Sequence, residues 1–313
     1  MEINILALLI ILGINLLISP FLIYALGRFR FYKQGETTKE IESKRNKKYY
    51  KHLLSNMHTP STFGILLVLN LLIVTLLFKT SGTFRIVSLV AIILGLLGFA
   101  DDLYEFFYYK KTGRWGFKAR YKMFIQILTF FGLAYILTNS LLVSIPLSLI
   151  FAFILNSFNI TDGLDGLAAG TALPTFAVFT YLEYLNYGTS DIFFLLLLVI
   201  GFLVVFLIFN IKPAKVFLGD SGSYALGAIL AFLTFRYNIF FTIPLITVFL
   251  VEGISSLLQI LSLGIFKRRV FKIAPLHLHL LNSGWSQWKV ILTSWGTQAI
   301  IAILTFLAIT YVR

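Results

Sequence analysis

The sequence predicts an all-α, polytopic membrane protein, and three observations favour that fold class. The 313-residue chain is 58% hydrophobic and only 12% charged, about half the charged share of a typical soluble domain. Its apolar residues form about ten runs, each close to the roughly 20 residues that a helix needs to cross a bilayer. It contains no cysteine, which excludes a disulfide-stapled module and a cysteine-built metal or redox site. We therefore expect one transmembrane domain over residues 1–313.

About ten transmembrane helices are expected in chain order. The first apolar run lacks the basic segment that opens a cleavable signal peptide, so we interpret it as a span. Two later spans, the sixth and the eighth, follow glycine-rich turns. The expected helices cover 3–26, 61–78, 84–100, 123–138, 141–158, 167–186, 191–210, 221–236, 238–263 and 289–311.

The basic residues predict the orientation of these helices. If the spans alternate in direction, one face of the membrane carries 22 of the 26 lysines and arginines and the other face carries four. The positive-inside rule then puts the first face in the cytoplasm and both termini outside. The loops on the cytoplasmic face are 27–60, 101–122, 159–166, 211–220 and 264–288.

The scarce acidic residues are informative because six of the thirteen lie where an apolar helix meets the predicted cytoplasmic face. An isolated carboxylate at membrane depth costs about 2.5–3.5 kcal/mol, so several of them on one face favour a compensating cation. Mg²⁺ suits them, because it takes one or two carboxylates and leaves room for substrate phosphates. For any single aspartate, helix capping or anchoring is an equal alternative. The six are Asp101, Asp102, Glu105, Asp162, Asp165 and Asp220.

Glycine turns and a histidine pair add a phosphate-binding signal. The turns DGLDGLAAG and GDSGS let the backbone approach a phosphate at a helix N-terminus, although neither matches a Walker A or dinucleotide motif. His277 and His279 suit contact with a phosphate or a nucleotide, because no third histidine nearby would complete a zinc site. A surface pair is the alternative. Glu252, inside a helix, needs a partner or a cavity, with a structural or a functional role equally open.

Five segments together resemble one family, the polyprenyl-phosphate N-acetylhexosamine-1-phosphate transferases. They are HTPSTFGILL (58–67), GFADD (98–102), NSFNITDGLDGLAAG (156–170), NIKPAKVFLGDSGSYALG (210–227) and RRVFKIAPLHLHLLNSGWSQWKV (268–290). The nearest branch is the one that transfers phospho-N-acetylmuramoyl-pentapeptide. The resemblance covers the chain from about residue 58 to its C-terminus and implies a ten-helix layout.

The resemblance implies the reaction and its cofactor. A phospho-sugar passes from a UDP-linked amino sugar to undecaprenyl phosphate at the cytoplasmic face of the plasma membrane, giving lipid I and UMP. This is the first membrane step of peptidoglycan synthesis, and it needs Mg²⁺. A homodimer is also implied. Phosphate-bearing substrates and the membrane account for the net charge of +13, so no nucleic-acid partner is expected.

The resemblance also assigns residues. Asp220 would hold the metal, Asp101 and Asp102 would lie beside the polyprenyl phosphate, and His277 and His279 would bind the diphosphate. Asp101 is the candidate for deprotonating or positioning the acceptor phosphate. Phe217 could stack on uracil, and Asp162 and Asp165 would either lie in the nucleotide pocket or order the catalytic loops. The implied substrate-binding residues are Lys122, Asn159, Asp162, Asp165, Asn210, Lys215 and Phe217.

The chain departs from the family pattern at several positions. The peptidoglycan branch has three consecutive histidines where this chain has His277, Leu278 and His279, and Glu105 replaces a lysine. A UDP-N-acetylglucosamine-1-phosphate transferase is therefore an alternative with the same chemistry. A secondary transporter is an alternative of another class. It predicts acids near the bilayer midplane, where only Glu252 is expected.

Overall fold

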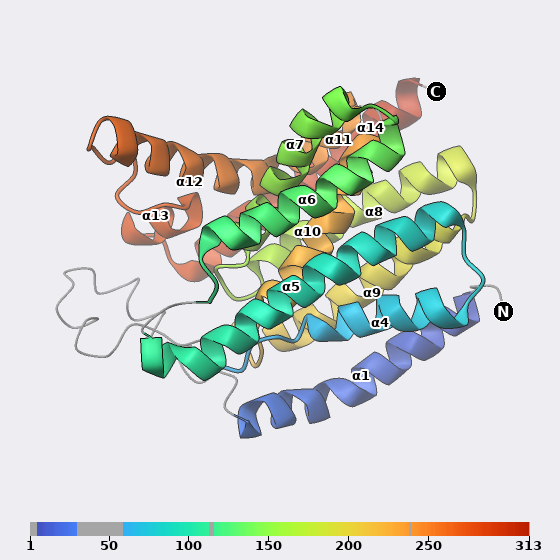
Figure 1. The fold of residues 1–313 in the computed structure, drawn as a ribbon, viewed down its shortest axis with the longest axis horizontal. Coiled ribbons are helices and arrows are strands. Elements are labelled where there is room, and N and C mark those ends of the chain that lie inside the picture. The colour runs from blue at the N-terminus through green and yellow to red at the C-terminus, as the bar shows by residue number, and fades with distance from the viewer. Residues whose placement is uncertain (1–4, 30–58, 113–115, 238, 313) are drawn as a thin grey trace.

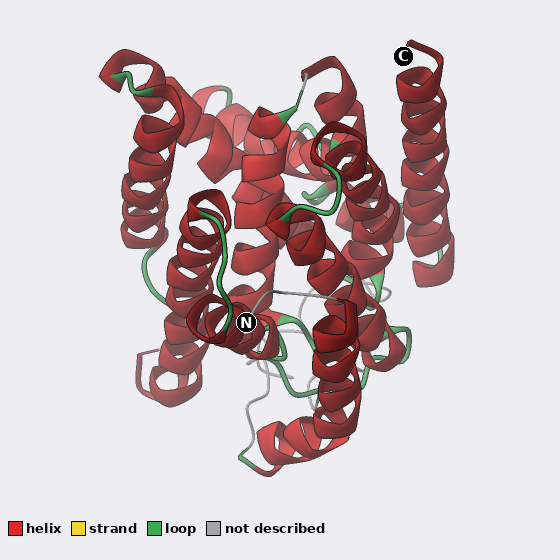
Figure 2. Ribbon diagram, turned by 90° about the vertical axis from the view of Figure 1, so that its right-hand side faces the viewer, coloured by secondary structure: helices red, strands yellow, loops and turns green. Residues whose placement is uncertain are grey.

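The computed structural model describes residues 5–29, 59–112, 116–237 and 239–312. Every regular element in that part of the chain is a helix (Figures 1 and 2), as the sequence predicts. Most of the basic loop expected at 27–60 lies outside the described residues. The helices are α1 (Ile5–Arg28), α4 (Ile65–Leu77), α5 (Gly82–Thr112), α6 (Ala119–Thr138), α7 (Leu141–Thr161), α8 (Leu167–Tyr187), α9 (Asp191–Asn210), α10 (Gly219–Arg236), α11 (Ile239–Leu245), α12 (Thr247–Ile265), α13 (Leu276–Asn282) and α14 (Gln287–Val312).

Seven of the described helices are long and apolar enough to cross a membrane: α1, α5, α6, α7, α9, α12 and α14. The shorter α4 is also apolar. A polytopic all-helical membrane protein is therefore confirmed, whereas the count of ten spans remains a prediction. In Figure 1 the start of α1 and the end of α14 lie towards the same end of the bundle, and α5 and α12 finish towards the opposite end.

The span expected at 238–263 is broken at Ile246 into α11 and α12. Pro244 lacks a backbone N–H just before this break. The backbone groups freed by a break inside a membrane need partners, because lipid offers none. Gln298 of α14 supplies two of them: its Nε2 donates to the Leu245 carbonyl at 3.0 Å and its Oε1 accepts from the Val248 N–H at 3.3 Å.

Helix α10 is the centre of the molecule. Every residue from Ser221 to Leu233 is buried, and α10 makes its most extensive contacts with α5 and α7. Small residues allow this close packing. A Cβ atom added at Gly98 of α5 would lie 2.2 Å from the Asp220 carbonyl oxygen, so only glycine lets the two backbones approach so closely at the first turn of α10.

The C-terminal end of α10 is held by a buried carboxylate, in a set of contacts that we name the Glu183 clamp. Arg236 donates from Nε and Nη2 to the two oxygens of Glu183, at 2.8 and 2.9 Å. Tyr237 and Ser190 donate their hydroxyls to the same carboxylate, and the Arg236 guanidinium lies 4.3 Å from the centre of the Tyr187 ring. A bidentate pair with further donors satisfies this buried charge.

Candidate active site

The loop before α4 and the loop before α10 pair through their backbones. The N–H groups of Phe63 and Gly64 donate to the carbonyls of Phe217 and Leu218, at 3.1 and 2.8 Å. In return, the Phe217 N–H donates to the Pro60 carbonyl at 2.8 Å. Two of the five sequence segments that carry the family resemblance are thus hydrogen-bonded to each other. They meet immediately before the first turn of α10.

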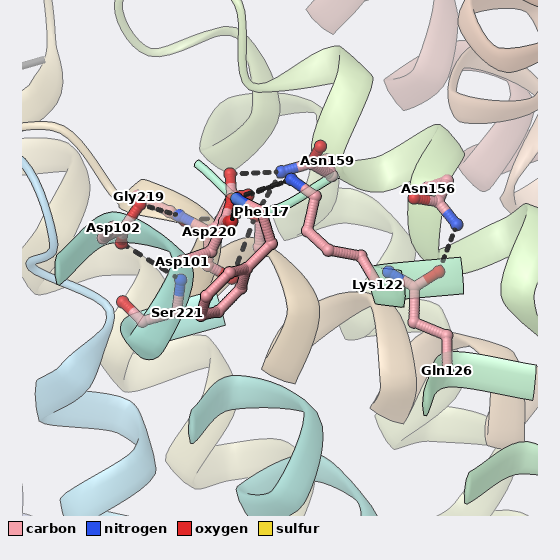
Figure 3. Close-up of polar contacts among 11 residues, drawn as sticks. Asp101, Asp102, Phe117, Lys122, Gln126, Asn156, Asn159, Gly219, Asp220 and Ser221 are labelled. Carbon is pink, nitrogen blue, oxygen red and sulfur yellow. Dashed lines mark hydrogen bonds and ion pairs between the residues drawn. The ribbon is translucent and has the colours of Figure 1, made fainter. Parts of the chain in front are cut away.

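Asp102 of α5 caps the N-terminus of α10. Its two oxygens accept from the N–H groups of Asp220 and Ser221, at 3.2 and 3.5 Å (Figure 3). The first N–H groups of a helix have no partner within the helix, and a carboxylate is favourable there. Gly219 has a φ of +75°, and a Cβ atom on it would lie 2.6 Å from Asp102 Oδ2, so this position requires glycine.

Lys122 of α6 joins two carboxylates that come from different helices (Figure 3). Its Nζ lies 2.7 Å from Asp101 Oδ2 and 3.4 Å from Asp220 Oδ2. Asp101 also accepts the Phe117 N–H through Oδ1, and only 6% of its side chain is exposed. The side chain of Asp220 is 23% exposed. The ammonium therefore holds two acids together, the more accessible of which is Asp220.

Asn159, near the end of α7, fixes the other oxygen of Asp220. Its Nδ2 donates to Asp220 Oδ1 at 3.0 Å and to Ser223 Oγ at 2.8 Å. The structure thus brings Asp101, Lys122, Asn159 and Asp220 into one cluster. Ser223 was not identified from the sequence, although its spacing of three from Asp220 on a helix places the two on one face.

The donor set of this cluster fits Mg²⁺. Mg²⁺ prefers oxygen ligands and binds through one or two carboxylates together with water and substrate phosphates. Asp220 supplies an accessible carboxylate, with Asp101 beside it across Lys122. No group of three metal-ligating side chains converges in the described part of the chain. The arrangement fits a metal shared with a phosphate substrate better than one enclosed by protein ligands alone.

The histidine pair lies in α13, and His277 forms a second cluster beside the turn that follows α7. His277 is 1% exposed, and its Nδ1 lies 3.0 Å from Glu252 Oε2. A Cβ atom added at Gly163 would lie 2.4 Å from His277 Nε2, so the imidazole faces the turn that follows α7. Nδ1 of His279 accepts the Lys272 N–H at 3.2 Å. Because Asn159 belongs to the first cluster and Gly163 to the second, the end of α7 and the turn that follows it connect the two clusters.

Asp165 and Asn210 are both buried and tie loops together. Asp165 Oδ2 accepts the Ala214 N–H at 3.2 Å. Asn210 accepts the Gly166 N–H and donates to the Val216 carbonyl, both at 2.8 Å. Of the two roles expected for Asp165, these contacts favour the ordering of loops, and Asn210 makes contacts of the same kind.

The remaining predicted residues lie around these loops. Asp162 follows the last residue of α7 as its C-terminal cap, and its N–H donates to the Asn159 carbonyl at 3.1 Å. It does not cap the next helix, where Gly166 takes the N-cap position. Lys215 is exposed, and Phe217 is half-buried in the paired loops.

Known proteins match the chain over almost its full length. Residues 84–238, which contain Asp101, Lys122, Asn159 and Asp220, match the model of glycosyl transferase family 4. The chain is 32% identical to the phospho-N-acetylmuramoyl-pentapeptide-transferase of Anoxybacillus flavithermus, over 93% of each sequence. It is also 32% identical to that of a Geobacillus species, over 97% of each, and 30% identical to that of Bacillus subtilis, over 93% of each. The chain therefore belongs to the phospho-N-acetylmuramoyl-pentapeptide-transferases, within glycosyl transferase family 4.

Proposed function

We propose that the chain transfers phospho-N-acetylmuramoyl-pentapeptide from its UDP-sugar to undecaprenyl phosphate, with release of UMP and formation of lipid I. The observation that carries the proposal is the cluster in which Lys122 joins Asp101 and Asp220, in a member of this family. The cluster combines a cation for phosphate with carboxylates for a metal and a proton. Those are the groups that a transfer between two phosphate-bearing substrates requires.

The reaction is a direct displacement at phosphorus. An oxygen of undecaprenyl phosphate attacks the β-phosphorus of the UDP-sugar, the bond from that phosphorus to the bridging oxygen breaks, and UMP leaves with the electron pair. Asp101 positions the acceptor phosphate or accepts its proton, and Lys122 attracts its negative charge. Asn159 orients Asp220, which would hold Mg²⁺. When bound, the metal relieves the charge that develops on the diphosphate.

The nucleotide is proposed to lie between the α7 turn and the loop before α10. His277 and His279 contact the diphosphate, and Phe217 stacks on uracil. Asp162 borders this pocket, and Lys215 contacts a phosphate. Asp165 and Asn210 act indirectly by holding the two loops together. Asp102 acts in the same way, because its cap on α10 fixes Asp220.

We further propose how the site is placed in the membrane and in the cell. The chain acts as a single transferase domain with ten spans in the plasma membrane, with its site on the cytoplasmic face and both termini outside. It forms a homodimer and needs no nucleic acid. The supporting observation for the orientation is the concentration of 22 basic residues on one predicted face.

Release of UMP from defined substrates tests the function. Purified protein with undecaprenyl phosphate and Mg²⁺ is expected to release UMP from UDP-N-acetylmuramoyl-pentapeptide. Asp220→Asn is expected to lower the rate roughly 100-fold or more, because it removes the carboxylate proposed for the metal. Asp191→Asn is the matched control, since Asp191 opens α9 at the end of that helix opposite to Asn210 and accepts the Ser81 N–H. Release from UDP-N-acetylglucosamine alone would contradict the proposed substrate.

An isotope-exchange experiment tests the direct displacement. Without a lipid acceptor, radiolabelled UMP is expected not to enter the UDP-sugar, because no covalent intermediate on the enzyme is formed. A phosphate monoester is already an anionic nucleophile, so a carboxylate nucleophile is unnecessary. Rapid exchange in the rigorous absence of undecaprenyl phosphate would instead favour an intermediate on an aspartate.

A further inference from the structure

A stripe of three buried polar side chains runs along the largely apolar helix α12. Glu252, Ser255 and Gln259 follow one another at spacings of three and four residues, which places them on one face of the helix. All three are buried, with exposures of 3%, 4% and 8%. Polar groups buried in a membrane helix need partners, and each member of this stripe finds one in the segment that carries the two histidines.

Each member of the stripe accepts a backbone N–H from that segment. Gln259 Oε1 accepts from Phe271 at 2.9 Å, and Ser255 Oγ accepts from Leu276 at 3.0 Å. Both oxygens of Glu252 accept the His277 N–H at 3.2 Å. The N–H groups that open a short helix such as α13 have no partner within the helix. The stripe on α12 therefore fixes the path of the histidine segment.

Glu252 also determines which nitrogen of His277 carries a proton. An ionised carboxylate can only accept a hydrogen bond, so Nδ1 of His277, 3.0 Å from Glu252 Oε2, must be the donor. His279 has the opposite arrangement, because its Nδ1 accepts the Lys272 N–H and leaves the proton on Nε2. Their different hydrogen-bond partners thus assign opposite tautomers to the two neutral imidazoles.

We propose that Glu252 is a positioning residue of the transferase. It keeps the proton of His277 on Nδ1 and holds the buried imidazole with Nε2 against the turn beside Gly163, so that the histidine segment keeps a fixed place beside the turn where the proposed function puts the diphosphate. His279 offers its Nε2–H as a donor. Leu278 between them packs on the apolar cluster of Leu164 and Leu281. In this chain, two histidines in fixed and different tautomers thus replace a continuous histidine run.

The tautomers can be observed directly. The full-length protein has four histidines, so ¹⁵N-histidine labelling gives few signals, and His277→Asn identifies those of His277. At pH 8.5 we expect His277 protonated on Nδ1 and His279 protonated on Nε2. In Glu252→Gln, the single amide oxygen is expected to accept the His277 backbone N–H, which turns the NH2 group towards Nδ1. The His277 proton is then expected to move to Nε2 while the His279 signals stay unchanged.

Two control variants separate positioning from general loss of structure. Ser255→Ala removes the neighbouring hydrogen bond to Leu276 but leaves the Glu252–His277 pair, so the His277 signals should keep their wild-type positions. Glu183→Gln removes a buried carboxylate of the Glu183 clamp and should leave the histidine signals unchanged. If Glu252→Gln does not fold, the wild-type spectrum alone still tests the Nδ1 assignment.

Kinetics supply the second measurement. Glu252→Gln is expected to lower kcat/KM for the UDP-sugar roughly 10- to 100-fold, with little change in KM for undecaprenyl phosphate, because a misdirected group at one substrate costs about that much. An unprotonated Nδ1 in wild type, or unchanged His277 signals in Glu252→Gln, would overturn the positioning role. A wild-type enzyme that releases no UMP would contradict the proposed function instead, and the spectra would still decide the tautomers.

Discussion

Lys122 is the residue on which the geometry of the site depends. It faces Asp101 and Asp220 at 2.7 and 3.4 Å, and so joins α5 to the first turn of α10. Without the ammonium, two carboxylates from different helices would repel each other at short range. The charge of Lys122 therefore stabilises the two carboxylates in the folded site, and we propose that it also attracts the substrate phosphate.

Substitution of Lys122 tests both roles. Lys122→Met is expected to lower kcat/KM for UMP release at least 100-fold, since it removes a preorganised charge, and to lower the melting temperature. Lys118→Met, one turn earlier at the exposed N-cap of α6, is the matched control and should keep near wild-type activity. Equal activity of the two variants would exclude a role for Lys122 in the reaction.

At the scale of single residues, the sequence indicates the charged residues of the site. It does not indicate the uncharged polar residues that hold neighbouring segments in place. Asp101 and Asp220 are conspicuous because acids are rare at the ends of apolar helices. Ser255 and Gln259 look ordinary in a membrane helix, and only their contacts with backbone N–H groups far along the chain reveal their purpose. The capping role of Asp102 likewise depends on the approach of α5 to α10.

At the scale of elements, the junction of α11 and α12 depends on a side chain from another helix. Gln298 is fully buried and meets the Leu245 carbonyl and the Val248 N–H. Thr175 of α8 donates a second hydrogen bond to Leu245, at 2.8 Å. The broken helix is thus stabilised by α8 and α14, and it carries the polar stripe that positions the histidines.

Gln298→Leu should weaken this junction. The Val248 N–H loses its acceptor, and a buried unpaired backbone group costs about 1–3 kcal/mol. We expect the melting temperature in detergent to fall by a few degrees. Thr310→Val, on the exposed side of the same helix, removes only a hydrogen bond to the Leu307 carbonyl and should change the melting temperature little. Equal melting temperatures for the two variants would contradict the role of Gln298.

The sequence predicts the helices better than it predicts their interruptions. Nine of the expected spans each correspond to one observed helix, because long apolar runs are a direct signal. The tenth, 238–263, is continuous in hydropathy, so its hydropathy gives no sign of the break. The break becomes stable only when side chains of α8 and α14 form hydrogen bonds with the backbone groups that it frees. The extension of α5 to Thr112 was missed for a related reason, since its last turns contain charged residues beyond the apolar run.

For the whole molecule, the orientation in the membrane can be tested because the chain has no cysteine. A single cysteine can therefore be introduced without background labelling. Ser283→Cys, exposed beside the histidine segment, is expected to react with an impermeant maleimide only from the cytoplasmic side. Thr189→Cys, exposed in the short connection between α8 and α9, should react only from outside. The reverse pattern in intact cells and inverted vesicles would contradict the proposed orientation.

The Glu183 clamp has a consequence for how this protein can change. It lies about 24 Å from Asp220 along α10, at 1.5 Å per residue, so substitutions in the substrate-facing loops leave its buried ion pair intact. Interactions that stabilise one end of a helix can compensate for destabilising substitutions at the other end. Function is lost only when the stability of the whole fold drops below the threshold that function needs. The clamp thus gives the catalytic end freedom to diverge, and a departure such as His-Leu-His can arise without loss of the fold.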